Sequence, residues 1–202
     1  MTESAHALHL PIDEAKLPED MQRYFARCRE KLGFVPNVLE SYAFDAAKLQ
    51  AFVGFYNDLM LAASPLTKLE REMIAVVVSA ANRCFYCLTA HGAAVRELSG
   101  DPVLGEQLVM NYRSARLDAR TRSMLDFAHK LTVDSPAIEE VDRALLRNAG
   151  FDDRAIWDIA AVAAFFNMTN RMASAIDMRP NGEYHGQARQ PRPPTLRTKP
   201  GA

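Results

Sequence analysis

Two cysteines and a histidine form the most chemically distinctive pattern in the sequence: Cys84 and Cys87 are followed four residues later by His91. On a helix, residues three and four positions apart lie on one face, about 5–6 Å apart at Cβ. The two thiols could then form a disulfide with modest adjustment, and the imidazole would lie one turn beyond them. A thiolate is the nucleophilic form of cysteine, and an adjacent imidazole or a helix N-terminus favours it. The pattern predicts thiol redox chemistry.

Glu72 is the acid that best complements this pattern. It lies on the largely apolar segment 69–81, so we expect part of its side chain to be buried. A buried carboxylate is costly without a partner, and orienting His91 would provide one. We therefore expect an acid–base–thiol relay, with a solvated charge at a helix start as the alternative for Glu72.

Other interpretations of the cysteines are open at this point. Zinc binding by Cys84, Cys87 and His91 is one, although three ligands on a single helical face are poorly placed around a tetrahedron. A non-catalytic helical oligomer is another. Cys28 lies on an amphipathic segment and is expected to be a buried small hydrophobic residue.

Four further side chains are candidates for supporting roles. Tyr86 lies between the cysteines and could donate a hydrogen bond to the site or only pack. Asn167, Asn170 and Arg171 interrupt an apolar helix and could lie near the site or at an interface.

Composition narrows the class of protein. The chain has 202 residues and a net charge of -1, so it carries no basic field for nucleic acid. No apolar run approaches the roughly 20 residues that span a bilayer, and the N-terminus lacks the pattern of a signal peptide. Three cysteines, two of them closely spaced, do not resemble the disulfide framework of a secreted protein. We expect a cytoplasmic protein without membrane contact.

The elements that must position these residues are expected to be helices. Glycine is scarce, with 9 residues, and no segment alternates long enough for a strand. Thr67 and Glu70 form a capping-box pattern, and Asn82-Arg83 is either a break before a new helix at Cys84 or part of a continuous helix. The expected organisation is an arm over 1–16, a helical domain over 17–178 and a Pro/Arg-rich tail over 179–202. Helices are expected over 18–32, 45–61, 69–81, 118–131, 136–150 and 152–176, with another starting at 102.

Glu72 with Cys84-x-x-Cys87-x-x-x-His91 resembles the alkylhydroperoxidase AhpD core of the carboxymuconolactone decarboxylase-like superfamily. Segments 32–38, 66–72 and 166–171 are similar to its peroxidase-related branch. The resemblance spans roughly residues 17–184, and the Cys-Glu-His motif is its specific part. Tyr86 is a departure, because the best-known members have a histidine between the cysteines.

This resemblance implies an all-α, AhpD-like helical fold in which a pair of core helices carries the CxxC motif, within a homo-oligomer that is often a hexamer. It implies peroxide reduction without haem, metal or other cofactor. Cys87 would be the peroxidatic cysteine, Cys84 the more exposed resolving one, and His91 with Glu72 the proton relay.

The expected function is reduction of hydrogen peroxide or organic hydroperoxides through a Cys84–Cys87 disulfide. A dithiol or a thioredoxin-like reductant would then restore the thiols. The alternative is a thiol–disulfide relay or redox sensor that has the same residues but little peroxide turnover.

Overall fold

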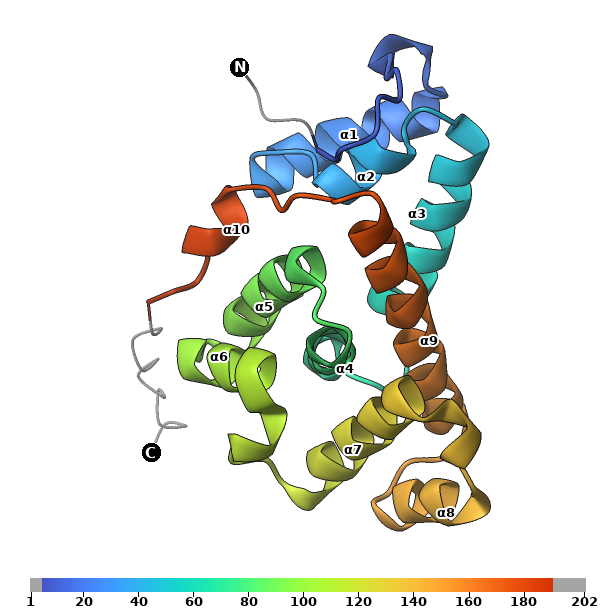
Figure 1. Cartoon of the computed structure of the whole chain (residues 1–202), viewed down its shortest axis with the longest axis vertical. Coiled ribbons are helices and arrows are strands. Elements are labelled where there is room, and N and C mark those ends of the chain that lie inside the picture. Colours follow the sequence, from blue (N-terminus) through green and yellow to red (C-terminus); the bar gives the residue numbers. More distant parts are fainter. Residues whose placement is uncertain (1–4, 191–202) are drawn as a thin grey trace, which may run out of the picture.

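The computed structural model describes residues 5–190, and all the regular structure in this range is helical, which confirms the all-α prediction. The ten α-helices lie around one core, with α4 at the centre and α5, α6, α7 and α9 surrounding it (Figure 1). The α-helices are α1 (Glu19–Leu32), α2 (Asn37–Tyr42), α3 (Ala46–Leu61), α4 (Lys68–Ala81), α5 (Phe85–Ser99), α6 (Pro102–Asn111), α7 (Ala119–Val133), α8 (Glu140–Asn148), α9 (Asp153–Ala175) and α10 (Glu183–Gly186). Three short 3₁₀ helices accompany them: Glu14–Lys16, Tyr112–Ser114 and Ser135–Ala137.

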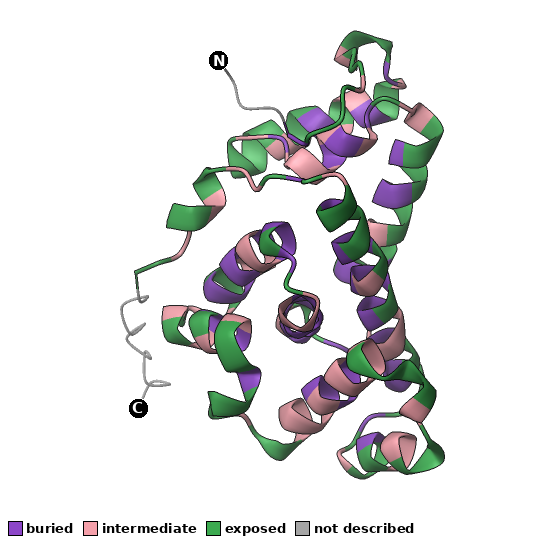
Figure 2. Cartoon of the chain, in the orientation of Figure 1, coloured by how far each residue is buried: buried purple, intermediate pink, exposed green. Residues whose placement is uncertain are grey.

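The central helix α4 is buried on every side. All its residues from Glu70 to Ser79 are buried, and Figure 2 shows the helix end-on in the middle of the molecule. Its start is defined by the predicted capping box: the Glu70 N–H donates to Thr67 Oγ1 at 3.1 Å, and the Thr67 N–H donates to Glu70 Oε2 at 2.7 Å. Packing of this apolar cylinder provides the core on which the other helices assemble.

Two charged residues of α4 bind neighbouring helices. Arg71 is 3% exposed and donates to the Leu59 and Ala62 carbonyl oxygens, at 3.1 and 2.9 Å, where α3 ends. Glu70 forms an ion pair with Arg120 in the first turn of α7. These contacts position α3 and α7 against α4 and provide partners for most of the buried polar atoms of Glu70 and Arg71, although Arg71 Nε makes no hydrogen bond within residues 5–190.

The connection between α4 and α5 is a sharp break at the predicted place. Arg83 adopts a left-handed conformation with φ of 55°, which costs a residue with a Cβ about 1–2 kcal/mol. Cys84 then takes an extended conformation as N-cap of α5, and its N–H donates to the Ser79 carbonyl at 3.0 Å. The alternative of one continuous helix is therefore wrong.

One expected helix begins later than predicted. Ser135–Ala137 form only a 3₁₀ turn, and Ile138 is extended, so the helix expected from residue 136 starts at Glu140 as α8. A reciprocal capping interaction between Glu139 and Asp142 defines the new start.

The chain ends that are described pack against the helices. The Ala7 N–H donates to the Ile176 carbonyl and the Arg179 N–H to the Ala5 carbonyl, both at 2.9 Å. Residues 179–190, which the sequence assigns to the tail, include α10 and follow the outside of α5. Residues 1–4 and 191–202 of the predicted arm and tail lie outside the described residues.

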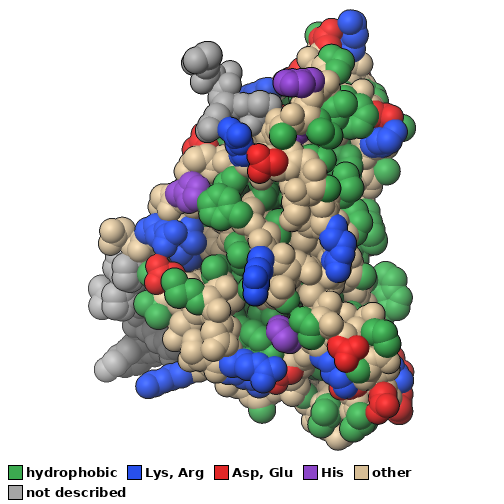
Figure 3. All heavy atoms as spheres, viewed as in Figure 1, with side chains coloured by type: hydrophobic (Ala, Val, Ile, Leu, Met, Phe, Trp, Pro, Cys, Tyr) green, Lys and Arg blue, Asp and Glu red, His purple; other side chains and the backbone are tan. Residues whose placement is uncertain are grey.

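The surface charge and the length of the helices bear on whether the protein could bind nucleic acid or span a membrane. Lys and Arg side chains are interspersed with acidic and hydrophobic ones on the face in Figure 3 and do not form one basic field. Within residues 5–190, no helix is long and apolar enough to cross a membrane.

We predict that Thr67→Ala lowers the free energy of unfolding by about 1 kcal/mol, because it removes the hydroxyl that caps the central helix. Thr67 is exposed, so no cavity is created. Chemical denaturation measures the change, and Thr67→Ser, which keeps the hydroxyl, serves as the control. Equal loss in both variants would contradict the capping explanation.

Candidate functional site

The two cysteines of the motif meet at the start of α5. Both are free thiols; they are hydrogen-bonded to each other and only 1% and 3% exposed for Cys84 and Cys87. They belong to a small apolar cluster that also contains Tyr86, Ala173 and Met178.

The prediction that Cys84 is the more exposed cysteine is wrong. As N-cap, Cys84 lies against the first turn of α5 and is covered by the apolar cluster. Cys87 instead lines the large cavity described below, and Cys84 does not.

The thiol pair is electrostatically asymmetric. A hydrogen bond from the Cys87 thiol lowers the pKa of Cys84 to about 7 despite burial, and the backbone N–H groups at the start of α5 and the charge of His91 act in the same direction. The same hydrogen bond, together with burial, raises the pKa of Cys87. The first proton lost from the pair therefore leaves the negative charge on Cys84, and Cys87 donates to it.

His91 and Glu72 form a close buried pair. His91 Nδ1 lies 2.6 Å from Glu72 Oε2, and their side chains are 13% and 10% exposed. An ionised carboxylate can only accept a hydrogen bond, so Nδ1 carries the proton and Nε2 is left as the basic nitrogen. The His91 ring also meets the Phe166 ring edge to face, with centroids 4.6 Å apart, which fixes its orientation. Glu72 on α4 thus holds the imidazole on α5.

Cys87 has two polar neighbours, Asn170 and Ser79. The sequence pattern identified Asn170 as a candidate for a supporting role but did not identify Ser79. The side chains of Asn170 and Ser79 hydrogen-bond the Cys87 sulfur, which lowers its pKa and partly offsets the dominant upward effects. Asn170 Nδ2 also donates to Ser79 Oγ at 3.0 Å. Ser79 is fully buried, and its one sequence signal is a hydroxyl within an otherwise apolar run.

Asn82 is a second residue that sequence analysis missed. Its Nδ2 donates to Asn167 Oδ1 and Asn170 Oδ1, each at 3.0 Å, so α9 is bound to the turn that precedes Cys84. Asn167 and Asn170 therefore come close to the cysteine pair. Arg171 does not: it is exposed, donates to the Asn167 carbonyl and amide oxygens, and does not line the cavity.

Tyr86 has a packing and positioning role. Its hydroxyl accepts a hydrogen bond of 3.0 Å from the Val38 N–H in the first turn of α2. Its ring lines the cavity, and burial raises the pKa of its hydroxyl. Tyr86 therefore joins α2 to α5 and stays neutral.

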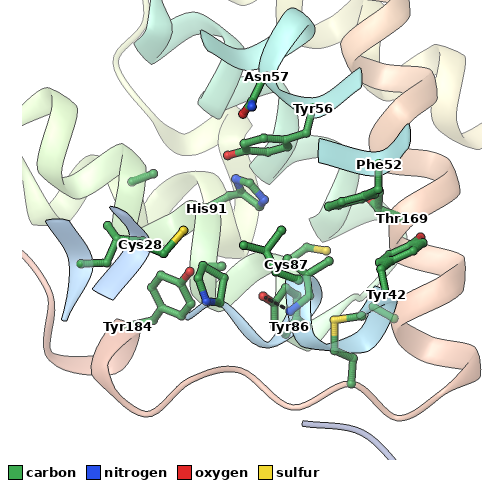
Figure 4. A pocket seen from close by; sticks show the side chains of 18 of the residues that line it. Cys28, Tyr42, Phe52, Tyr56, Asn57, Tyr86, Cys87, His91, Thr169 and Tyr184 are labelled. Atoms are coloured by element: carbon green, nitrogen blue, oxygen red, sulfur yellow. Dashed lines mark hydrogen bonds between the residues drawn. The ribbon is translucent and has the colours of Figure 1, made fainter. Parts of the chain in front are cut away.

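A cavity of about 620 Å³ opens in front of Cys87 and His91. Helices α1, α2, α3, α5 and α9 and the segment after α9 surround it, and Figure 4 shows Cys87 and His91 among the side chains that enclose it. Its lining is mostly apolar and includes Tyr42, Phe52, Tyr56, Phe165, Phe166 and Tyr184. Cys28 lines it from α1, half-buried rather than fully buried as expected, and burial raises the pKa of its thiol.

The arrangement of the side chains does not suit a metal ion. Among the residues that the structure describes, no three His, Cys, Asp or Glu side chains converge on a common point, and this includes Cys84, Cys87 and His91. Glu72 already occupies one nitrogen of the imidazole.

Comparison with known proteins places this site in context. The sequence profile of the Carboxymuconolactone decarboxylase family matches residues 46–102. An uncharacterized peroxidase-related protein from Silicibacter sp. TM1040 is 66% identical, with a TM-score of 0.89 over 93% of this chain and 97% of that one. A second uncharacterized peroxidase-related protein, from Ralstonia eutropha JMP134 and described as an alkylhydroperoxidase AhpD core, is 42% identical, with a TM-score of 0.90 over 95% of this chain and 100% of that one.

A more distant structure shares the fold. The debrominase Bmp8, solved in complex with 2,3,4-tribromopyrrole, is 18% identical, with a TM-score of 0.76 over 91% of this chain and 97% of that one. No curated protein matches the chain.

The asymmetry of the thiol pair can be measured directly. We predict that titration of the reduced protein, followed by the ultraviolet absorbance of the thiolate, shows one ionisation with a midpoint at about 7. An ordinary thiol has a pKa of about 8.5. Cys84→Ser should abolish this step and Cys28→Ser should leave it unchanged. A first ionisation near 8.5 in the wild type would contradict the prediction.

Proposed function

Because the chain belongs to the AhpD-like carboxymuconolactone decarboxylase family, we propose that it is a thiol-dependent peroxidase that reduces hydroperoxides through Cys84 and Cys87. The observation that carries the proposal is the position of Cys87. It lines the cavity beside His91, and its partner thiol lies behind it at the N-terminus of α5.

The proposed reaction begins at Cys87. The Cys84 thiolate or His91 Nε2 takes the Cys87 proton, and the Cys87 thiolate attacks one oxygen of the hydroperoxide. The O–O bond breaks, Cys87 becomes a sulfenic acid, and the alkoxide that leaves takes a proton and departs as the alcohol. Glu72 stabilises the imidazolium whenever His91 holds the proton.

Disulfide formation completes the oxidation. The Cys84 thiolate attacks the Cys87 sulfur, the sulfenic oxygen leaves as water, and a Cys84–Cys87 disulfide forms. In sum, one hydroperoxide and two thiols give one alcohol, one water and one disulfide, and an external dithiol restores the thiols by exchange. The deep burial of both sulfurs favours a small dithiol that enters the cavity over a protein that must reach the sulfur directly.

The same burial bears on the alternative of a thiol–disulfide relay. A partner protein would have to bring its own cysteine to sulfurs that are at most 3% exposed. A small peroxide has no such difficulty. The geometry therefore supports peroxide reduction over a relay between proteins.

The decisive experiment follows hydroperoxide consumption by the reduced protein with a dithiol regenerant. We expect turnover in the wild type and in the control Cys28→Ser, and none in Cys87→Ser or Cys84→Ser. Cys84→Ser should still consume one equivalent and accumulate a sulfenic acid at Cys87. A sulfenic acid that instead forms at Cys84 in Cys87→Ser would reassign the nucleophile. No consumption by the wild type would overturn the proposal.

Glu72→Gln tests the relay. We expect kcat/KM to fall by about 10–100-fold, because a neutral amide no longer holds His91 with Nδ1 protonated and Nε2 basic. Disulfide formation with an added oxidant should persist, since both thiols are intact. Glu30→Gln, an exposed change on α1, is the matched control. A similar effect of both substitutions would argue against a specific relay.

A further inference from the structure

The size and lining of the cavity exceed what hydrogen peroxide needs. A volume of about 620 Å³ lies within the range of sites that bind drug-sized molecules. Aromatic rings build one wall: the Tyr42 and Phe52 rings are stacked at 4.5 Å between centroids, and Phe165 follows 5.7 Å from Phe52. A molecule of two or three atoms would leave most of this apolar surface uncovered. The wall therefore indicates a substrate with a large apolar body.

Helix α1 contributes two cations to the lining of the same cavity. Arg27 and Lys31 are four residues apart, so they lie on one helix face with Cys28, which also lines the cavity. Neither cation forms an ion pair with any residue from 5 to 190. By contrast, Arg23 and Arg29, on the same helix, are paired with Glu19 and Glu14.

Among the described residues that line the cavity, no acidic side chain is free to pair with Arg27 or Lys31. Glu72 is the one acidic side chain among the described residues that line the cavity, and it is already paired with His91. Arg27 lies over the Tyr24 ring, 5.4 Å from its centroid, and keeps its charge exposed. The lining therefore has an unbalanced positive charge on α1, which favours an anionic group on the ligand.

Two tyrosine hydroxyls also line the cavity. Within the described part of the chain, the hydroxyls of Tyr56 and Tyr184 make no hydrogen bond to the protein. Burial and the charge of Glu72 raise the pKa of both hydroxyls, so they stay neutral and can donate. Figure 4 shows both tyrosines among the side chains around His91 and Cys87. These donors suit the oxygens of a hydroperoxide.

We propose that the cavity binds an apolar carboxylic acid, with its carboxylate at Arg27 and Lys31 and its body against the aromatic wall, and that the substrate is the hydroperoxide of such an acid. The part that concerns turnover rests on the function proposed above. The part that concerns binding does not, because it requires only the cavity and the two cations.

Binding is tested by calorimetry with decanoate, and with decanol as an uncharged probe of the same length. In the double variant Arg27→Gln/Lys31→Gln, decanoate should bind about tenfold or more weakly than in the wild type, and decanol should be unaffected. Arg23→Gln, which removes one positive charge from the same helix outside the cavity, should leave both affinities within about twofold. Equal affinity of decanoate for all three proteins would overturn the proposal.

Turnover is tested with the hydroperoxide of linoleic acid and with its methyl ester. The double variant should raise KM for the acid about tenfold with little change in kcat, and leave KM for the ester unchanged. Decanoate binding without hydroperoxide turnover in any variant would refute the peroxidase and support the binding site. Turnover with the same KM for acid and ester in every variant would support the peroxidase and overturn the carboxylate site.

Discussion

Burial of α4 from Glu70 to Ser79 is the constraint on which the rest of the structure depends. A helix without access to water must find a partner for every polar side chain that it carries. Each partner of α4 comes from a different part of the chain: Arg71 binds the end of α3, Glu70 pairs with α7, Glu72 with α5 and Ser79 with α9. The polar side chains of α4 thus fix the positions of four other helices. Two of these contacts, Glu72 with His91 and Ser79 with Asn170, lie at the redox centre.

Local helix geometry gives the two thiols of the pair different pKa values and different access to the cavity. Cys84 is the N-cap residue of α5, where the backbone N–H groups of the first turn help to lower the pKa of its thiol, whereas Cys87 lies one turn inside and lines the cavity. One position stabilises negative charge and the other is open to a substrate. The left-handed conformation of Arg83 ends the preceding helix and leaves Cys84 at the start of α5. A continuous helix would place Cys84 within the helix rather than at its end.

Features governed by neighbouring residues could be predicted from the sequence. The capping box at Thr67 follows from local chemistry and is present in the structure. For Asn82-Arg83 and for Glu72 the sequence offered two alternatives each, and the structure has the break and the buried partner. The late start of α8 was missed because an extended residue follows a proline turn that resembles a helix start.

Features that depend on long-range packing could not be predicted. Ser79 and Asn82 act through α9, about ninety positions away along the chain. The burial of Cys84 depends on residues from α9 and the segment after it, and residues 179–190 have a composition that gives no indication of packing. The cavity is formed by segments that are far apart in the sequence, so no local sequence pattern predicts it.

The segment that follows α9 has a consequence for how this fold diversifies. Arg96 of α5 donates to the Tyr184 and Gln187 carbonyl oxygens, at 2.9 and 3.0 Å, and so fixes the residues that close one side of the cavity. Together with α1 and α2, these residues lie outside the 46–102 region that carries the family signature and the redox groups. A large part of the cavity wall is thus encoded outside the stretch that carries Glu72, the two cysteines and His91, although Phe52 and Tyr56 of the wall lie within it. Substitutions in α1, α2 or the segment after α9 can therefore change the shape of the cavity without replacing any of those four residues.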